Sequence, residues 1–406
     1  MWASGLLLLI AFPTKRAFAA TTSDPSAADH GSGLSGGLQQ GDQWYHNLPG
    51  DAGLIQWMLG KSLSLIPYLN QPADPLPSVA VREEQYRFDA VFSQRQGSVR
   101  HFIGDIATMM GSRGRTYPVI FDTGSGDTWL VSTRLGSALD PPRTGYFRDP
   151  LTKTVRGPAQ LEYLTTSTTC DTWVTEFLSF KSGKRGWDCS VCISDTTSVT
   201  LKAVSGVVGA DLSSPLVQAF GTFWLVPISY PRVGLLLGDV THPSYRCKEG
   251  VMHYSRVPFL TNIWRVSGSM SLGNDVPVSV SARIDTGVNR LYLSRSLWVK
   301  FTKGLSRFGV ELAKQVPAGD FSTSKCDSIA SFPVVRIMFG SFIFDLTPEM
   351  YVSIVEDGSR CAIQLDVHDS AYDNEVLIGA PVLTRIVTRW QSGWFPTIGF
   401  CTPSIV

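Results

Sequence analysis

The chain has 406 residues, which is too long for one hydrophobic core, because single cores stop growing at about 250–300 residues. Its 35 basic and 34 acidic residues leave a net charge of +1, so no excess of charge directs it to nucleic acid or to an anionic membrane. Only 17% of the residues are charged, while 37 Gly and 24 Pro supply many turns. This balance favours many short strands over long charged helices.

The first predicted element is a signal peptide over residues 1–19. An apolar run at residues 6–12 is followed by the small-x-small pattern of residues 17–19, which is typical of a secretory cleavage site. The run is shorter than the roughly 18 residues that span a bilayer, so no membrane anchor is predicted. No Lys or Arg precedes the run, so an ordinary disordered N-terminus is the alternative.

Residues 20–85 are predicted to form a leader or prosegment that is partly disordered. Residues 21–41 are mainly Ser, Gly, Ala and Asp, and they cannot bury enough apolar surface to fold. Residues 51–69 turn apolar, with spacings compatible with a short amphipathic helix. Four prolines between residues 67 and 77 then end any regular element.

The body of the chain begins near residue 86 and is predicted to be all-β. Runs of Val, Ile, Phe, Tyr and Thr are broken by Gly, Pro, Asp and Asn, which indicates one strand after another. Short helices are predicted only near residues 214–220, 294–301 and 381–385.

An internal repeat divides this body into two parts. Residues 119–124, Val-Ile-Phe-Asp-Thr-Gly, resemble residues 282–287, Ala-Arg-Ile-Asp-Thr-Gly. Two apolar residues and a Gly follow each copy, with the Gly 87 and 94 residues after the Asp. Two copies at similar spacing indicate duplication. We therefore expect two related β-lobes, residues 86–250 and 251–406, with a cleft between them.

The residues around both copies resemble the pepsin-like aspartic proteases. Residues 121–129, Phe-Asp-Thr-Gly-Ser-Gly-Asp-Thr-Trp, are similar to that family's first active-site loop, and residues 283–287 are similar to its second. Three further segments match the family: 102–106, 377–381 and 398–400. The resemblance runs from about residue 90 to the C-terminus, and it implies a bilobal fold in which each lobe supplies one Asp.

The chemistry of the family requires two such loops. Amide hydrolysis by water needs a base to activate the water and an acid to protonate the carbonyl oxygen. Two carboxyl groups about 3 Å apart share one proton, as is known for aspartic proteases. The resemblance therefore implies catalysis by Asp122 and Asp285 on a polypeptide held in extended conformation. It implies no cofactor and no metal.

The other loop residues are expected to support the two carboxyl groups. The hydroxyls of Thr123 and Thr286 can lock the loops together, and Gly124 and Gly287 let backbone N–H groups approach the carboxylates. Ser125 can donate a hydrogen bond to the first carboxylate and hold it ionised.

The second loop departs from the family at Val288, where the family usually has Ser or Thr. Asp285 is therefore expected to lack a hydroxyl donor. This difference favours a protonated Asp285 and an ionised Asp122, and it is expected to raise the upper pKa of the pair.

A hairpin that closes over the cleft, the flap, is the third element of such enzymes. Tyr163 lies 41 residues after Asp122, near the place of the family's flap Tyr, and Trp129 matches the Trp that supports the flap. No Gly follows Tyr163, so a stiffer flap is expected, and a Tyr in an ordinary strand is the alternative. Trp264 and Phe259 are further candidates for lining the cleft.

The seven cysteines suit an oxidising compartment if six of them pair. The resemblance implies a disulfide between Cys326 and Cys361. From the residues alone, Cys170 is expected to pair with either Cys189 or Cys192. The CxxC of the latter two lacks a second ligand pair, and the histidines lack metal-binding spacings, so no metal site is predicted.

Together these features predict a secreted, monomeric aspartic endopeptidase of the extracellular space or an acidic vacuole, with a preference for apolar residues around the scissile bond. The rival hypothesis is a catalytically weak or inactive relative that binds a peptide or protein, which Val288 and the unusual flap favour. The family's prosegment is basic, whereas residues 20–85 hold two basic and seven acidic residues. Lys61 is therefore the only plausible residue to block the dyad before activation.

Overall fold

The computed structural model describes residues within 88–404, all of which belong to one compact unit, Gln85–Val406. The gaps in the description are 93–100, 111–113, 140–141, 149–152, 164–166, 182–184, 198–203, 231, 240–246, 260, 311, 313–320, 323–328, 355–360 and 370–371. The predicted signal peptide at 1–19 and leader at 20–85 lie outside the described residues.

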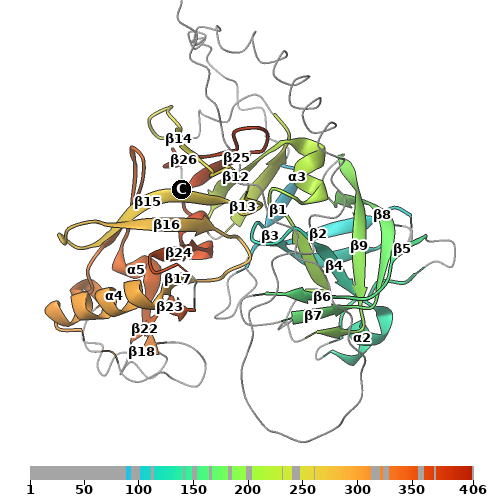
Figure 1. Ribbon diagram of the computed structural model, residues 1–406, viewed down its shortest axis with the longest axis horizontal. Helices are drawn as coiled ribbons and strands as arrows, with labels where there is room; N and C mark the ends of the chain where they lie inside the picture. The colour runs from blue at the N-terminus through green and yellow to red at the C-terminus, as the bar shows by residue number, and fades with distance from the viewer. Residues whose placement is uncertain are drawn as a thin grey trace, which may run out of the picture. The chain divides into compact units, whose positions relative to one another are not determined.

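The described part is mostly β-sheet, so the predicted all-β class is confirmed (Figure 1). The first large sheet has the strand order β2 (Ile103–Thr108), β3 (Thr116–Asp122), β11 (Gly206–Gly209), β4 (Thr128–Val131), β9 (Gly186–Ser194), β8 (Thr172–Phe180) and β5 (Thr154–Arg156). The second large sheet has the order β20 (Phe342–Leu346), β19 (Val335–Phe339), β15 (Arg265–Leu272), β16 (Val278–Ile284), β24 (Glu375–Ile378), β17 (Leu291–Ser294) and β23 (Leu365–His368).

Three smaller sheets complete the described part. The six-stranded sheet has the order β1 (Ala90–Phe92), β13 (Arg232–Leu237), β12 (Thr222–Ser229), β25 (Val387–Gln391), β26 (Thr397–Cys401) and β14 (His253–Arg256). The two three-stranded sheets are β10 (Thr196–Thr197), β7 (Ser167–Cys170) and β6 (Ala159–Glu162), and β18 (Phe321–Ser322), β22 (Cys361–Ile363) and β21 (Val352–Ile354).

The two large sheets repeat one strand order. In the first, β3 runs parallel to β11, β11 antiparallel to β4, and β4 parallel to β9. In the second, β16, β24, β17 and β23 make the same three pairings in the same order. β2 and β15 each add an antiparallel neighbour, to β3 and β16 respectively. The internal repeat expected from the sequence is therefore present as a repeated order of five strands.

The sheets differ in how they close. β2 pairs with both β3 and β8, so the first sheet curls into a barrel-like form, whereas the second remains a half-barrel. The central strands β11 and β24 are buried along their whole length, which suits their short, largely apolar sequences. β2 alternates between buried and half-buried residues, as a strand with one face on the core does.

Three of the helices lie where the sequence predicts helices. These are α3 (Pro215–Phe220), α4 (Arg295–Arg307) and α6 (Ala380–Leu383). The short elements α2 (Thr133–Ala138), α5 (Pro348–Tyr351) and the 3₁₀ turn η3 (Ile329–Ser331) were not expected. Across the described ranges, no helix is both long and apolar enough to cross a membrane.

A chain of aromatic rings joins the first sheet to the rest of the core. Phe121 on β3 contacts Phe223 on β12 with ring centroids 5.6 Å apart, and Phe223 stacks on Trp390 of β25 at 5.3 Å. Trp264 packs edge-on against Trp390 at 5.2 Å and has 0% exposure. The interpretation of Trp264 as a cleft residue is therefore wrong, because its indole is part of the core and donates to the Ala210 carbonyl.

The disulfides follow the alternation of strand β9. Cys170 on β7 pairs with Cys192, which is one of the two predicted partners, and Cys189 is a buried free thiol. Residues three apart on a strand face opposite sides, so Cys192 reaches β7 and Cys189 faces the main core. A second disulfide, Cys247 to Cys401, was not predicted. Such bonds are typical of extracellular and secretory-pathway proteins.

The predicted disulfide between Cys326 and Cys361 is only half described. Cys361 is disulfide-bonded, and its predicted partner Cys326 lies outside the described residues.

Candidate active site

The two Asp-Thr-Gly loops follow equivalent strands of the repeat. Asp122 is the last residue of β3, and Asp285 directly follows β16. Each strand lies beside a parallel, fully buried neighbour, which orients the two loops in the same way. Both carboxylates are buried, with exposures of 6% and 2%.

Reciprocal hydrogen bonds between Thr123 and Thr286 fasten one loop to the other. Each hydroxyl accepts a hydrogen bond from the other residue's backbone N–H, at 2.9 and 3.0 Å. Each hydroxyl also donates to a carbonyl of the opposite strand, to Ile284 at 3.1 Å and to Phe121 at 2.6 Å. All four bonds are buried, so the predicted locking role of both threonines agrees with their contacts.

The two carboxylates receive different sets of donors. Oδ1 of Asp122 accepts from the Gly124 N–H at 2.8 Å, and Oδ2 accepts from the Ser125 hydroxyl at 2.7 Å. Oδ1 of Asp285 accepts from the Gly287 N–H at 2.9 Å. The place of Ser125 is taken in the second loop by Val288, which has no hydroxyl to donate.

Gly124 and Gly287 are needed because each lies against a carboxylate of the opposite loop, and not because their backbone angles require glycine. A Cβ on Gly124 would lie 2.1 Å from Oδ2 of Asp285, and a Cβ on Gly287 would lie 2.2 Å from Oδ1 of Asp122. Each loop's glycine therefore makes room for the carboxylate of the other loop.

The pKa of Asp285 is raised to about 7. Burial is the largest cause, followed by the charge of Asp122 and a hydrogen bond between the two carboxyl groups, while Arg283 and the Gly287 N–H act in the opposite direction. The direction agrees with the sequence-based expectation of a protonated Asp285. Its main cause is different, because burial outweighs the choice of donors.

Replacing Val288 by serine tests the missing donor. Serine at this position is expected to donate to the Asp285 carboxylate, as Ser125 does three residues after its own Asp. A donor favours the charged form and lowers the pKa. The pKa of Asp285 is therefore expected to move down by about one unit or less in Val288→Ser, and if the protein hydrolyses peptides, the alkaline limb of its pH profile of kcat/KM moves with it. Superimposable profiles of the two proteins on one peptide would contradict this expectation.

Tyr163 lies at the tip of the hairpin formed by β6 and β7, at the end of β6. Its hydroxyl accepts a hydrogen bond from Nε1 of Trp129 at 2.6 Å. Burial is the main cause that raises the pKa of Tyr163, and the charge of Asp122 raises it further. The predicted flap Tyr and the Trp expected to support it are thus hydrogen-bonded to each other.

Removing this hydroxyl in Tyr163→Phe is expected to cost about 1–3 kcal/mol of unfolding free energy, because the indole N–H of the fully buried Trp129 loses its partner. Urea unfolding measures the loss. The control is the double variant with Trp129→Phe, which leaves no orphaned donor. Losses that simply add would show that the hydrogen bond contributes nothing.

Two basic residues near Asp285, Arg283 and His101, were not anticipated. Arg283 lies with Nε 3.3 Å from Oδ2 of Asp285, and its Nη2 donates to the Gly124 carbonyl at 2.6 Å. His101, just before β2, has a pKa that burial lowers, while the charge of Asp285 acts to raise it. The sequence shows an Arg two residues before the Asp, but only the strand geometry shows that its side chain turns back to the carboxylate.

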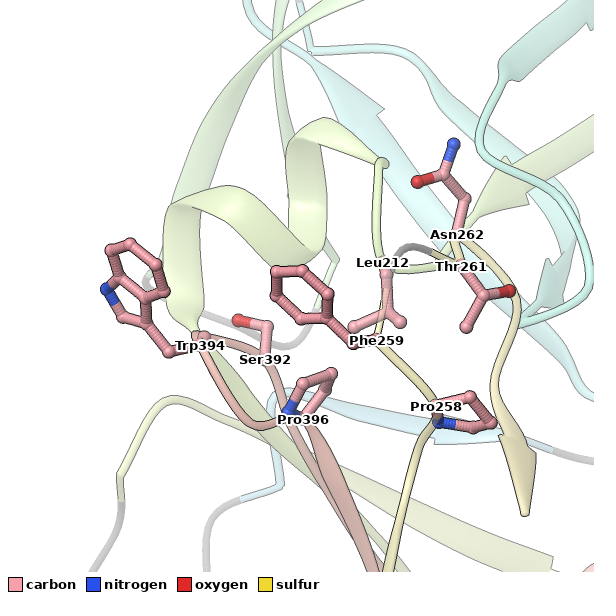
Figure 2. A pocket seen from close by; sticks show the side chains of 9 residues that line it. Leu212, Pro258, Phe259, Thr261, Asn262, Ser392, Trp394 and Pro396 are labelled. Carbon is pink, nitrogen blue, oxygen red and sulfur yellow. The ribbon is translucent and has the colours of Figure 1, made fainter. Parts of the chain in front are cut away.

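Two adjoining pockets on the described surface have linings that include neither Asp122 nor Asp285. Their volumes are about 210 and 270 Å³. Phe259, a candidate for the cleft, lines both, together with Pro258, Trp394 and Pro396 (Figure 2). Phe259 therefore lines a pocket, and its place in a substrate cleft stays a prediction.

No protein-family model matches the chain, and a search of curated proteins found no match. The resemblance of the loops and the geometry of the site are therefore the grounds for assigning a function.

Proposed function

We propose that the protein is a pepsin-like aspartic endopeptidase with a bilobal fold and a cleft at the two Asp-Thr-Gly loops. The observation that carries the proposal is the joining of two equivalent loops by four reciprocal Thr hydrogen bonds, with one buried Asp on each. Buried paired carboxylates cost free energy, so an arrangement that forces them together is expected to serve a chemical purpose.

The two carboxyl groups can divide the work of amide hydrolysis. Two hydrogen bonds stabilise the Asp122 carboxylate, which suits it to take a proton from a water bound between the loops. The raised pKa of Asp285 keeps that carboxyl protonated below about 7, so it can donate to the substrate carbonyl oxygen. The water oxygen then bonds to the carbonyl carbon and gives an intermediate with two hydroxyls. As the C–N bond breaks, the proton held by Asp122 passes to the leaving nitrogen and one of the two hydroxyls returns its proton to Asp285, which leaves a carboxylic acid and an amine and restores the dyad.

The substrate we propose is a polypeptide in extended conformation, covered by the hairpin of β6 and β7. A closing hairpin excludes water and commits the bound chain to reaction. The disulfides support passage through the secretory pathway. The preference for apolar residues beside the scissile bond stays a prediction.

The test is hydrolysis of a denatured protein between pH 3 and 6, with and without a peptide inhibitor that mimics the transition state. Cleavage that the inhibitor blocks is the expected result. Absence of cleavage at every pH, together with tight binding of the inhibitor, would instead identify a peptide-binding relative.

A further inference from the structure

The two loops carry opposite arrangements of a polar and an apolar residue around their Asp. In the first loop, Ile120 stands two residues before the Asp, and Ser125 stands three after it and donates to the carboxylate at 2.7 Å. In the second loop, the equivalent positions hold Arg283 and Val288. The polar side chain that contacts the carboxylate thus follows the Asp in the first loop and precedes it in the second.

Arg283 contacts both loops at once. Its Nε lies 3.3 Å from Oδ2 of Asp285, the oxygen that does not accept the Gly287 N–H. Its Nη2 donates at 2.6 Å to the carbonyl of Gly124, whose own N–H donates to the Asp122 carboxylate. With 21% side-chain exposure, the guanidinium lies mostly out of water, where its charge is weakly screened.

We propose that Arg283 is a positioning residue of the dyad, which holds the Asp285 carboxyl in place and ties its loop to the Gly124 peptide of the other loop. A guanidinium suits this task because one rigid planar group places its positive charge beside Oδ2 of Asp285 while it donates to the Gly124 carbonyl. The effect on catalysis rests on the proposed function, whereas the effect on Asp285 does not.

Other titratable groups face this cluster from several elements. His101, before β2, and His368, at the end of β23, both have a pKa lowered mainly by burial. Tyr163, at the end of β6, has a raised pKa and is neutral. Among the described residues, Arg283 is therefore the cation that opposes the negative charge of Asp122 beside Asp285 at neutral pH.

The test follows the titration of the Asp285 carboxyl by ¹³C NMR in the full chain, with the signal assigned by its loss in Asp285→Asn. Removing the positive charge in Arg283→Met is expected to raise the pKa of Asp285 by about one unit or more. Arg283→Gln keeps a donor for the Gly124 carbonyl and is expected to give the same direction of shift. If Arg283→Met does not fold, the titration of Asp285 in Arg283→Gln provides the test.

Arg265 provides a matched control. It lies directly opposite Arg283 in the register of β15 and β16 and forms its own ion pair with Glu375. Arg265→Met removes the same charge from the neighbouring strand, and the titration of Asp285 is expected to stay within a few tenths of a pH unit of the wild type.

The kinetic readout separates this inference from the proposed function. If the wild type cleaves peptides, kcat in Arg283→Met is expected to fall about tenfold or more through misplacement of the carboxyl, and the alkaline limb is expected to move up with the pKa. If the wild type cleaves nothing but the variants still shift the titration, the proposed function fails and the role of Arg283 stands. A titration unchanged in both variants, or an active enzyme with unchanged kcat and pH profile, overturns the inference.

Discussion

Asparagine at either Asp122 or Asp285 is expected to remove peptide hydrolysis, with a loss of about 10²- to 10⁴-fold or more in kcat for each variant alone. In the proposed mechanism each carboxyl has a separate part, one as base and one as acid, so neither can replace the other. The amide in Asp285→Asn imitates the neutral form that the raised pKa of this carboxyl favours below about 7, and the fold is therefore expected to persist.

The measurement is kcat/KM of both variants and the wild type on one peptide, with thermal unfolding to verify the fold. Asp211→Asn is the control, because Asp211 is also a buried carboxylate whose pKa burial raises, but its carboxylate bonds to Ser213. The control is expected to stay within a few-fold of the wild type. A dyad variant that keeps a tenth of the activity would argue against two carboxyls acting jointly.

Alanine at Gly124 or Gly287 is expected to be almost as damaging, although neither residue takes part in the chemistry. A methyl group there would lie 2.1 or 2.2 Å from a carboxylate oxygen of the opposite loop. The carboxylate must move, and a displacement of about 1 Å at a reacting group costs on the order of 100-fold in rate. We expect such a loss in kcat, with a smaller effect on the folded fraction.

Gly157→Ala is the matched control for this pair. A Cβ at Gly157 would meet no atom within 4 Å, so its kinetics are expected to match the wild type. Comparable rates in Gly124→Ala and in the control would show that the two carboxylates do not occupy the close positions described.

The sequence allowed the site to be predicted where the chemistry depends on short motifs. Both Asp residues, the hydroxyl donor of Ser125 and the threonine pair were expected, because each lies within a few residues of an Asp in a repeated pattern. The same two motifs predicted that the body is duplicated, whereas the order of the strands in each copy came only from the structure.

Contacts between residues far apart in the sequence were harder to predict from the sequence. The choice of Cys192 over Cys189 as the partner of Cys170 depends on which face of β9 each occupies, and the sequence left both open. The pairing of Cys247 with Cys401 joins segments 154 residues apart. Trp264 was misinterpreted because a buried Trp and a cleft Trp have the same local sequence pattern. Arg283 was missed because an Arg in a strand normally reaches solvent.

Active-site titration tests the central claim, that the two loops build one catalytic site, most directly. Peptide hydrolysis by the wild type is measured at an acidic pH while a tight-binding transition-state mimic is added in steps. We predict that the rate falls linearly to zero at one inhibitor per protein molecule. A rate that persists after one equivalent has bound would contradict a single shared dyad of Asp122 and Asp285.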